Sequence, residues 1–246
     1  MTDSDDLAAR LRHLRDKRGY LLPHHGLMAI SAPHLLDAYD ATYSALALEP
    51  RVLSRHDHEF VWLATLIATD EALGSHHIAR FRAAGGEARE IEAILALTAL
   101  VLGVDAYRFV NHHWLPHLPG LDPERAYLAA FKTVAAGMPL RLAHLAAAAV
   151  HTCQAAWDAL GWQICAACAD GVPEAELAES LSLTMFPGSV PHFVEAARVW
   201  RELIMAGKVS ASADFRAWAE MAGQGGYDEA SGKSSSQTSM RGGGHR

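Results

Sequence analysis

The chain has 246 residues, half of them apolar, with a formal net charge of −7 at pH 7 and three cysteines. This length can bury a substantial core, in one large domain or two small ones. A modest negative charge without a basic stripe speaks against nucleic-acid binding, and three cysteines do not form a disulfide framework. The abundance of Ala and Leu favours helices over sheet, so we predict an all-α fold.

Two features of the sequence speak against a membrane protein. Residues 1–6 are acidic and lack the basic-then-apolar order of a secretory signal. The longest apolar run, residues 93–103, is too short to cross a bilayer and predicts a buried helix. We therefore expect a soluble, cytoplasmic protein.

Apolar residues recur at helical spacing along most of the chain. Ser54 suits the N-cap of the helix that carries His58 and Glu59. Residues 19–26 have Gly and Pro at their ends and predict a loop. The other predicted helices cover residues 7–18, 33–46, 77–84, 87–101 and 106–113.

The second half of the chain repeats the first. A Pro- and Gly-rich segment, residues 114–120, separates the halves, and a shift of 86 residues places Gly171 on Gly85 and His144 on His58. Repeats of this length fit a duplicated helical domain. We predict a first copy over residues 1–117, a second over 118–222 and a disordered tail over 223–246.

The two copies differ at the residues that can carry chemistry. In this alignment Gln163 stands where the first copy has His77, and Leu145 stands where it has Glu59. We therefore expect the chemistry in the first copy. The second copy is expected to supply packing and a wall of the pocket.

Glu59 and the pair His76-His77 are the main candidates for chemistry. Glu59 opens one apolar helical run, and the two histidines open the next. A carboxylate and an imidazole that meet in an apolar pocket can act as an acid/base pair, because burial and neighbouring charges shift their pKa values. The alternative is a surface glutamate beside a capping histidine.

The order of these residues resembles the carboxymuconolactone decarboxylase family, which shares the all-helical fold of the alkylhydroperoxidase AhpD. In that family a Glu begins one helix, a His begins the next, and a Gly follows the His by eight residues, as Gly85 follows His77. Glu59 lies one residue closer to His77 than the family spacing. Either a residue is missing between Asp70 and His77, or His58 occupies the place of the acid.

The resemblance implies a cofactor-independent lyase that decarboxylates a small carboxylated lactone in aromatic-compound catabolism. His77, assisted by His76, would protonate the carbon that loses carbon dioxide. Glu59 or His58 would orient the imidazole or polarise the lactone. The same groups can serve isomerisation, hydration or lactone hydrolysis.

Substrate binding is expected from three neighbours of the acid. His56 and Arg55 would hold the substrate carboxylates, and Trp62 would line the pocket, although aromatic residues at helical spacing are also common in a core. His56 and His58 are two residues apart, so they face different sides of a helix and do not form a metal site. We predict neither a metal nor another cofactor.

Two rival functions remain. The peroxidase branch of the fold uses a CxxC just before its His, at positions that are Asp70 and Leu73 here. The CxxC of this chain, Cys165 and Cys168, lies elsewhere and is interpreted as a buried pair of small residues. The second rival is a non-catalytic helical binding protein. Because the family forms ring-like oligomers, we expect a homo-oligomer, a trimer of two-copy chains.

Overall fold

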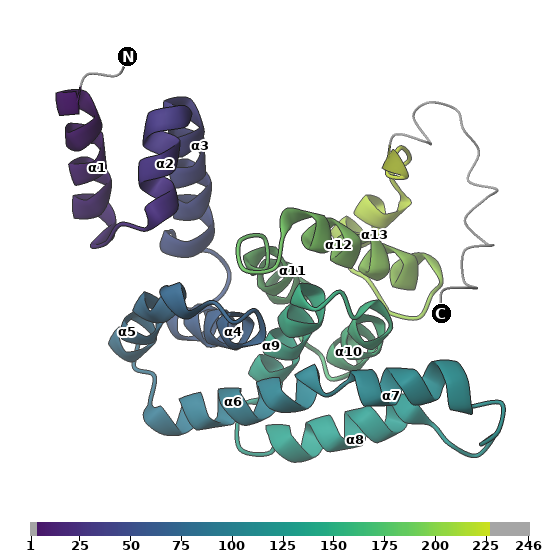
Figure 1. Cartoon of the computed structure of the whole chain (residues 1–246). Coiled ribbons are helices and arrows are strands. Elements are labelled where there is room, and N and C mark those ends of the chain that lie inside the picture. The colour runs from purple at the N-terminus through teal and green to yellow at the C-terminus, as the bar shows by residue number, and fades with distance from the viewer. Residues whose placement is uncertain (1–3, 227–246) are drawn as a thin grey trace.

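The computed structural model describes residues 4–226, which fold into helices without strands (Figure 1). This confirms the predicted all-α class. Most of the predicted tail, residues 227–246, lies outside the described residues. The α-helices are α1 (Ser4–Arg18), α2 (Pro23–Ser31), α3 (Pro33–Tyr43), α4 (Arg55–Ala68), α5 (His76–Ala83), α6 (Ala88–Leu102), α7 (Asp105–Phe109), α8 (Pro123–Ala135), α9 (Leu140–Cys153), α10 (Trp157–Ala169), α11 (Glu174–Leu183), α12 (Val190–Met205) and α13 (Ala213–Glu220).

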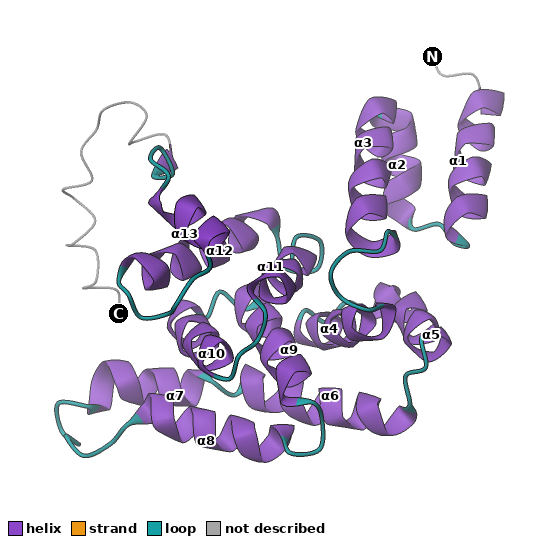
Figure 2. Ribbon diagram, turned by 180° about the vertical axis from the view of Figure 1, so that it is seen from behind, coloured by secondary structure: helices purple, strands orange, loops and turns teal. Residues whose placement is uncertain are grey.

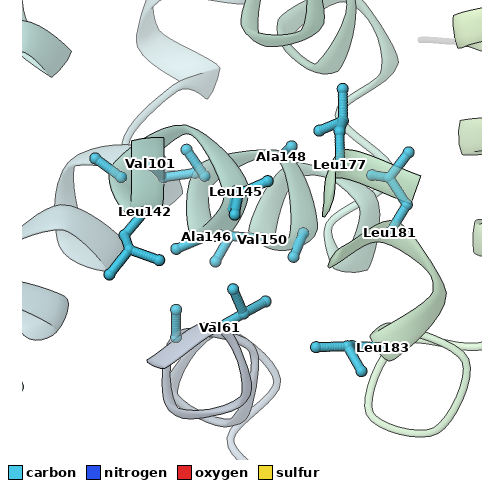
Figure 3. Packing of buried hydrophobic residues seen from close by; sticks show 14 of the residues in the cluster. Val61, Val101, Leu142, Leu145, Ala146, Ala148, Val150, Leu177, Leu181 and Leu183 are labelled. Atoms are coloured by element: carbon cyan, nitrogen blue, oxygen red, sulfur yellow. The ribbon is translucent and has the colours of Figure 1, made fainter. Parts of the chain in front are cut away.

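One apolar core joins the two predicted halves. Helices α4 and α9 pack against each other at its centre, and Figure 3 shows Val61 of α4 facing the side chains of α9. Ala146–Ala149 of α9 are fully buried, and their small side chains let neighbouring helices approach closely. Leu177 and Leu181 of α11 close the same cluster. The boundary near residue 117 therefore does not separate two independent cores.

Helices α1–α3 stand apart from this body (Figures 1 and 2). They pack around a small cluster of their own, formed by Leu14, Ala29 and Leu36. The prediction of a loop over residues 19–26 is wrong from Pro23 onward, because α2 begins there. Proline suits the first position of a helix, where its missing N–H has no intrahelical partner to lose.

The helices predicted over residues 87–101 and 106–113 are separated as expected, because α6 ends at Leu102 with Gly103 as its C-cap residue and α7 begins at Asp105. Together, residues Ala88–Trp114 make a helical run that is long and apolar enough, by length and composition alone, to cross a membrane, with 28% of its most apolar stretch buried. The run is therefore not the buried helix expected over residues 93–103. Leu95, Leu102 and Phe109 are 55%, 39% and 49% exposed and lie on its outer side.

Backbone geometry recurs between the two halves. Asp70 and Ala155 both have positive φ, at 54° and 53°, and lie 85 positions apart. Gly85 and Gly171, at 92° and 78°, lie 86 positions apart. The first half is therefore one residue shorter between these two turns, where the 3₁₀ turn Ala72–Ser75 stands before α5. Of the two alternatives left open by the sequence, this favours a missing residue between Asp70 and His77.

Candidate active site

Glu59 and His77 meet inside the first half of the protein. Ser54 caps α4 as predicted, because its hydroxyl accepts a hydrogen bond from the Asp57 amide, and this fixes Glu59 near the start of the helix. His77 is the second residue of α5. A hydrogen bond of 2.6 Å joins His77 Nδ1 and Glu59 Oε2, and the two side chains are 2% and 1% exposed. The alternative of a surface glutamate is wrong.

Burial governs the electrostatics of this pair. It raises the pKa of Glu59, against the opposing effect of nearby His58, Arg80 and Arg55. It lowers the pKa of His77, and neighbouring Arg80 and His58 act in the same direction. Glu59 Oε1 is buried and has no hydrogen-bond partner among residues 4–226. An ionised Glu59 beside a neutral His77 is therefore a poorly solvated anion, which gains stability when the pair takes up a proton.

His77 lines a cavity of about 250 Å³ between α1–α3 and the body. The Trp62 indole stacks on the imidazole with ring centroids 4.5 Å apart, so Glu59 and Trp62 fix its orientation. His77 Nε2 makes no hydrogen bond with the described residues, and a ligand in the cavity can reach this side chain. The other lining residues are Arg18, Tyr20, Leu22, His24, Tyr39, Tyr43, Leu66, Glu71, Leu73, Gly74, His76, Phe186 and Pro187.

His76 lies in the same wall and contacts the N-terminal helices. Its Nε2 is 3.1 Å from the hydroxyls of both Tyr20 and Tyr43. Burial, with a smaller effect of neighbouring His77 and Arg80, lowers the pKa of His76 to about 3, so the ring is neutral at physiological pH and accepts a hydrogen bond from a tyrosine. His76 therefore ties α1–α3 to the edge of the cavity.

His58 does not take the place of the acid. Its Nδ1 lies 3.2 Å from Glu179 Oε1, and its Nε2 accepts a 2.9 Å hydrogen bond from the Trp62 indole. Glu179 also accepts hydrogen bonds from the amides of Val52 and Leu53. A chain of contacts thus runs from Glu179 through His58 to the ring that packs on His77. Sequence reasoning missed Glu179, because nothing in the pattern of α11 distinguishes it from a surface glutamate.

Glu179→Gln is expected to lower the free energy of unfolding by roughly 1.5–3 kcal/mol at pH 7, because hydrogen bonds to a buried charge are lost. Burial alone would raise the pKa of Glu179, but the hydrogen bonds from His58, Leu53 and Val52 outweigh it and lower the pKa. The stabilisation is therefore present above the unfolded pKa and is lost as the pH falls below it. Urea unfolding at several pH values measures the difference.

The control for this prediction is Glu195→Gln, which removes an exposed carboxylate paired with Arg198. Surface pairs contribute about 0–1 kcal/mol, so this variant should stay close to the wild type. If Glu179→Gln and Glu195→Gln unfold at the same urea concentration at pH 7, Glu179 does not stabilise the protein.

His56 and Arg55 do not share the cavity with His77. His56 lies 3.0 Å from both Asp57 and Glu90 through its two ring nitrogens. Arg55 donates to the carbonyl of Leu48. Neither residue lines the His77 cavity, so the expectation that they hold substrate carboxylates there has to be corrected. Trp62, in contrast, does line the cavity.

The second half contains a counterpart of the buried pair. The Gln163 amide donates a 2.6 Å hydrogen bond to His144 Nδ1, and His144 Nε2 lies 3.0 Å from Asp170. Gln163 stands 86 positions after His77, and His144 stands 85 after Glu59. The residue that contacts Gln163 is therefore His144 and not Leu145, and the two residues of this pair are one position farther apart in the chain than Glu59 and His77. His144 and Gln163 are both fully buried, and neither lines the His77 cavity.

The cysteines lie outside the cavity too. Burial raises the pKa of Cys165, and it raises that of Cys168 to about 11. A thiol with a raised pKa holds little of the reactive thiolate. Within residues 4–226, no group of three or more His, Cys, Asp or Glu side chains is arranged to hold a metal ion.

The geometry can thus move one proton between a buried imidazole and a small molecule in an aromatic-walled cavity. Glu59 orients the imidazole, and Trp62 packs on its face. Comparison of the chain with protein families, curated proteins and solved structures found no match.

Proposed function

We propose that the protein is a cofactor-independent acid/base enzyme that resembles 4-carboxymuconolactone decarboxylase and is built from two AhpD-like units. Its substrate is a small, unsaturated, carboxylated lactone of aromatic-compound catabolism. One observation carries the proposal: the 2.6 Å hydrogen bond between Glu59 and His77 is buried, and the imidazole lines a cavity.

His77 is proposed as the group that transfers the proton. With Nδ1–H donated to the Glu59 carboxylate, Nε2 carries the lone pair that accepts a proton from a substrate carbon. Uptake of this proton converts the pair from a net charge of −1 to zero, and burial favours the neutral state. Returning the proton to a neighbouring carbon completes an isomerisation.

Decarboxylation uses the same pair from its protonated state. The carboxylate of the substrate leaves as carbon dioxide, and the electrons of the broken bond remain on the substrate as an enolate. The imidazolium of His77 then gives its proton to that carbon, and the pair regains a proton from water. Glu59 stabilises the imidazolium without itself touching the substrate.

The walls of the cavity suit a small flat ring. Phe186 contacts Tyr39 and Tyr43 edge to face at centroid distances of 5.2 and 5.5 Å, and Trp62 completes the aromatic lining. Aromatic faces pack well on planar molecules. A screen of lactones and unsaturated acids, followed by ultraviolet absorbance and evolved carbon dioxide, tests the proposal. Turnover must depend on His77, whereas binding without turnover would support the rival of a non-catalytic binding protein.

The thiol-peroxidase rival makes a separate prediction. The double variant Cys165→Ser, Cys168→Ser is expected to retain the His77-dependent turnover of the wild type, because neither thiol lines the cavity. Steady-state assays of both proteins, with and without an alkyl hydroperoxide, measure this. Peroxide reduction by the wild type that disappears in the double variant would establish the rival.

We also propose that the protein is a cytoplasmic homo-oligomer, with a trimer as the expected form. The support is the exposed apolar stripe on α6 and α7, where Leu95, Leu102 and Phe109 alternate with Ala99 and Ala106 at spacings of four and three residues. This spacing is typical of a helix that packs against another helix. Light scattering of Leu102→Glu against the wild type tests the stripe, and a monomeric wild type would contradict it.

A further inference from the structure

We propose that Arg18 anchors a carboxylate of the ligand in the His77 cavity, so that the site takes a small flat ring bearing one carboxylate. The inference rests on the proposed function for the identity of the cavity. It goes further by naming the residue that anchors the ligand and by limiting the anchored charge to one carboxylate.

Arg18 is a buried cation with unused donors. It is the last residue of α1, its side chain is 1% exposed, and it lines the cavity. Nε donates to Asp40 at 2.9 Å, and Nη1 lies 3.1 Å from His25. Nη2 lies 2.7 Å from the same Asp40 oxygen, yet it makes no well-directed hydrogen bond within residues 4–226. A guanidinium has five N–H donors, so several remain for a ligand.

The carboxylate of Asp40 does not cancel the charge of Arg18. Lys17 binds the other oxygen of Asp40 at 2.6 Å, so two cations share one carboxylate and leave an excess positive charge. The guanidinium also lies over the ring of Tyr43, 4.4 Å from its centroid. This packing holds the plane of Arg18 in place, and Nη2 is its donor without a hydrogen bond among residues 4–226.

The other basic groups in the cavity wall are neutral at physiological pH. Burial lowers the pKa of His24 and lowers that of His76 to about 3. Glu71 lines the cavity as an exposed side chain whose carboxylate caps the Leu73 amide. Among the described lining residues, Arg18 is therefore the cation that a ligand anion would meet. One cation indicates one carboxylate, and the aromatic walls indicate a flat ring beside it.

Benzoate and benzamide test the anchor, because they share a shape and differ in charge. Calorimetric titration of the wild type is expected to show benzoate binding at least about tenfold more tightly than benzamide, as a charge-assisted bidentate contact requires. Arg18→Gln should bind the two compounds equally. Arg10→Gln is the matched control, because Arg10 lies on the same helix, pairs with Asp37 and does not line the cavity, and it should keep the preference.

Arg18→Lys provides a second variant if Arg18→Gln does not fold, as judged by circular dichroism. It keeps the positive charge but loses the planar guanidinium that binds a carboxylate through two N–H groups. Its preference for benzoate over benzamide should therefore lie between those of the wild type and Arg18→Gln. The anchor is wrong if the wild type binds benzoate no better than benzamide, or if a folded Arg18→Gln keeps the preference. The two proposals can fail separately. Turnover that does not depend on His77 would contradict the proposed catalysis but not the binding of a carboxylate by Arg18, whereas equal binding of benzoate and benzamide would contradict only the role of Arg18.

Discussion

We expect His77→Gln to lower kcat by about 10²–10⁴-fold, the usual contribution of a positioned acid/base group. The side chain of Gln fills most of the space of the imidazole and can bond to Glu59, but it cannot take up a proton from a substrate. KM should change much less, because the variant leaves Arg18 and the aromatic walls in place. Steady-state kinetics on the lactone identified by the screen measure both constants.

His112→Gln is the control for this variant. His112 is exposed on the far part of the long helical run and bonds to Asp158, so its loss should leave kcat unchanged. Circular dichroism must show that both variants keep their helices. A folded His77→Gln protein with wild-type kcat would remove His77 from the mechanism.

Glu59→Gln is expected to lower kcat by roughly 10²–10³-fold, because an imidazolium formed at His77 would then be a buried charge without its partner, at a cost of several kcal/mol. The amide still accepts the hydrogen bond from Nδ1–H, so the imidazole keeps its orientation. The loss therefore reports charge compensation and not position. Glu59→Asp, which keeps the charge and moves it, should fall between the wild type and Glu59→Gln.

The Glu59→Gln variant should also gain stability relative to the wild type as the pH rises. Burial raises the folded-state pKa of Glu59 above its ordinary value near 4.5. The folded state then holds more protons than the unfolded state, so the free energy of unfolding of the wild type falls as the pH rises upward from that value. The introduced amide does not lose a proton in this range, so the free energy of unfolding of the variant does not fall for this reason. Urea unfolding from pH 4 upward measures the free energy of unfolding of both proteins. If the advantage of the variant over the wild type stayed constant or shrank as the pH rose, the raised pKa would be wrong.

The part of the site that lies close together in the chain was predictable. Glu59 and His77 belong to consecutive helices joined by a short turn, and such helices usually pack side by side. Ser54 fixes the start of the first helix, and helical periodicity places Glu59 on an inward face. Sequence alone therefore leads to a buried acid/base pair.

Residues that arrive from distant helices were not predictable. Arg18 and Tyr20 belong to the cavity wall because the N-terminal part of the chain contacts α5 through Tyr20 and His76. Glu179 comes from α11 and contacts His58. Periodicity shows which side of a helix is buried, but it does not show which helix covers it. The same gap explains why Arg55 and His56, the nearest basic residues in the chain, were expected to hold the substrate.

The predicted alignment of the second half with the first was wrong for a different reason. A single shift of 86 residues aligns Gly171 with Gly85. The contact of His144 with Gln163, however, requires a shift of 85 residues between α4 and α9. One residue of difference rotates the expected face of a helix by about 100°. His144 was therefore aligned with His58, although its contact with Gln163 makes it the counterpart of Glu59.

Nitrogen-15 NMR of the histidine side chains at neutral pH tests the buried hydrogen bond between Glu59 and His77 most directly, since it needs no substrate. We expect His77 to show a proton held between Nδ1 and Glu59, shifted downfield, slow to exchange with water and perturbed in Glu59→Gln. An imidazole that exchanges freely and titrates at the ordinary value of about 6.5 would contradict the buried pair.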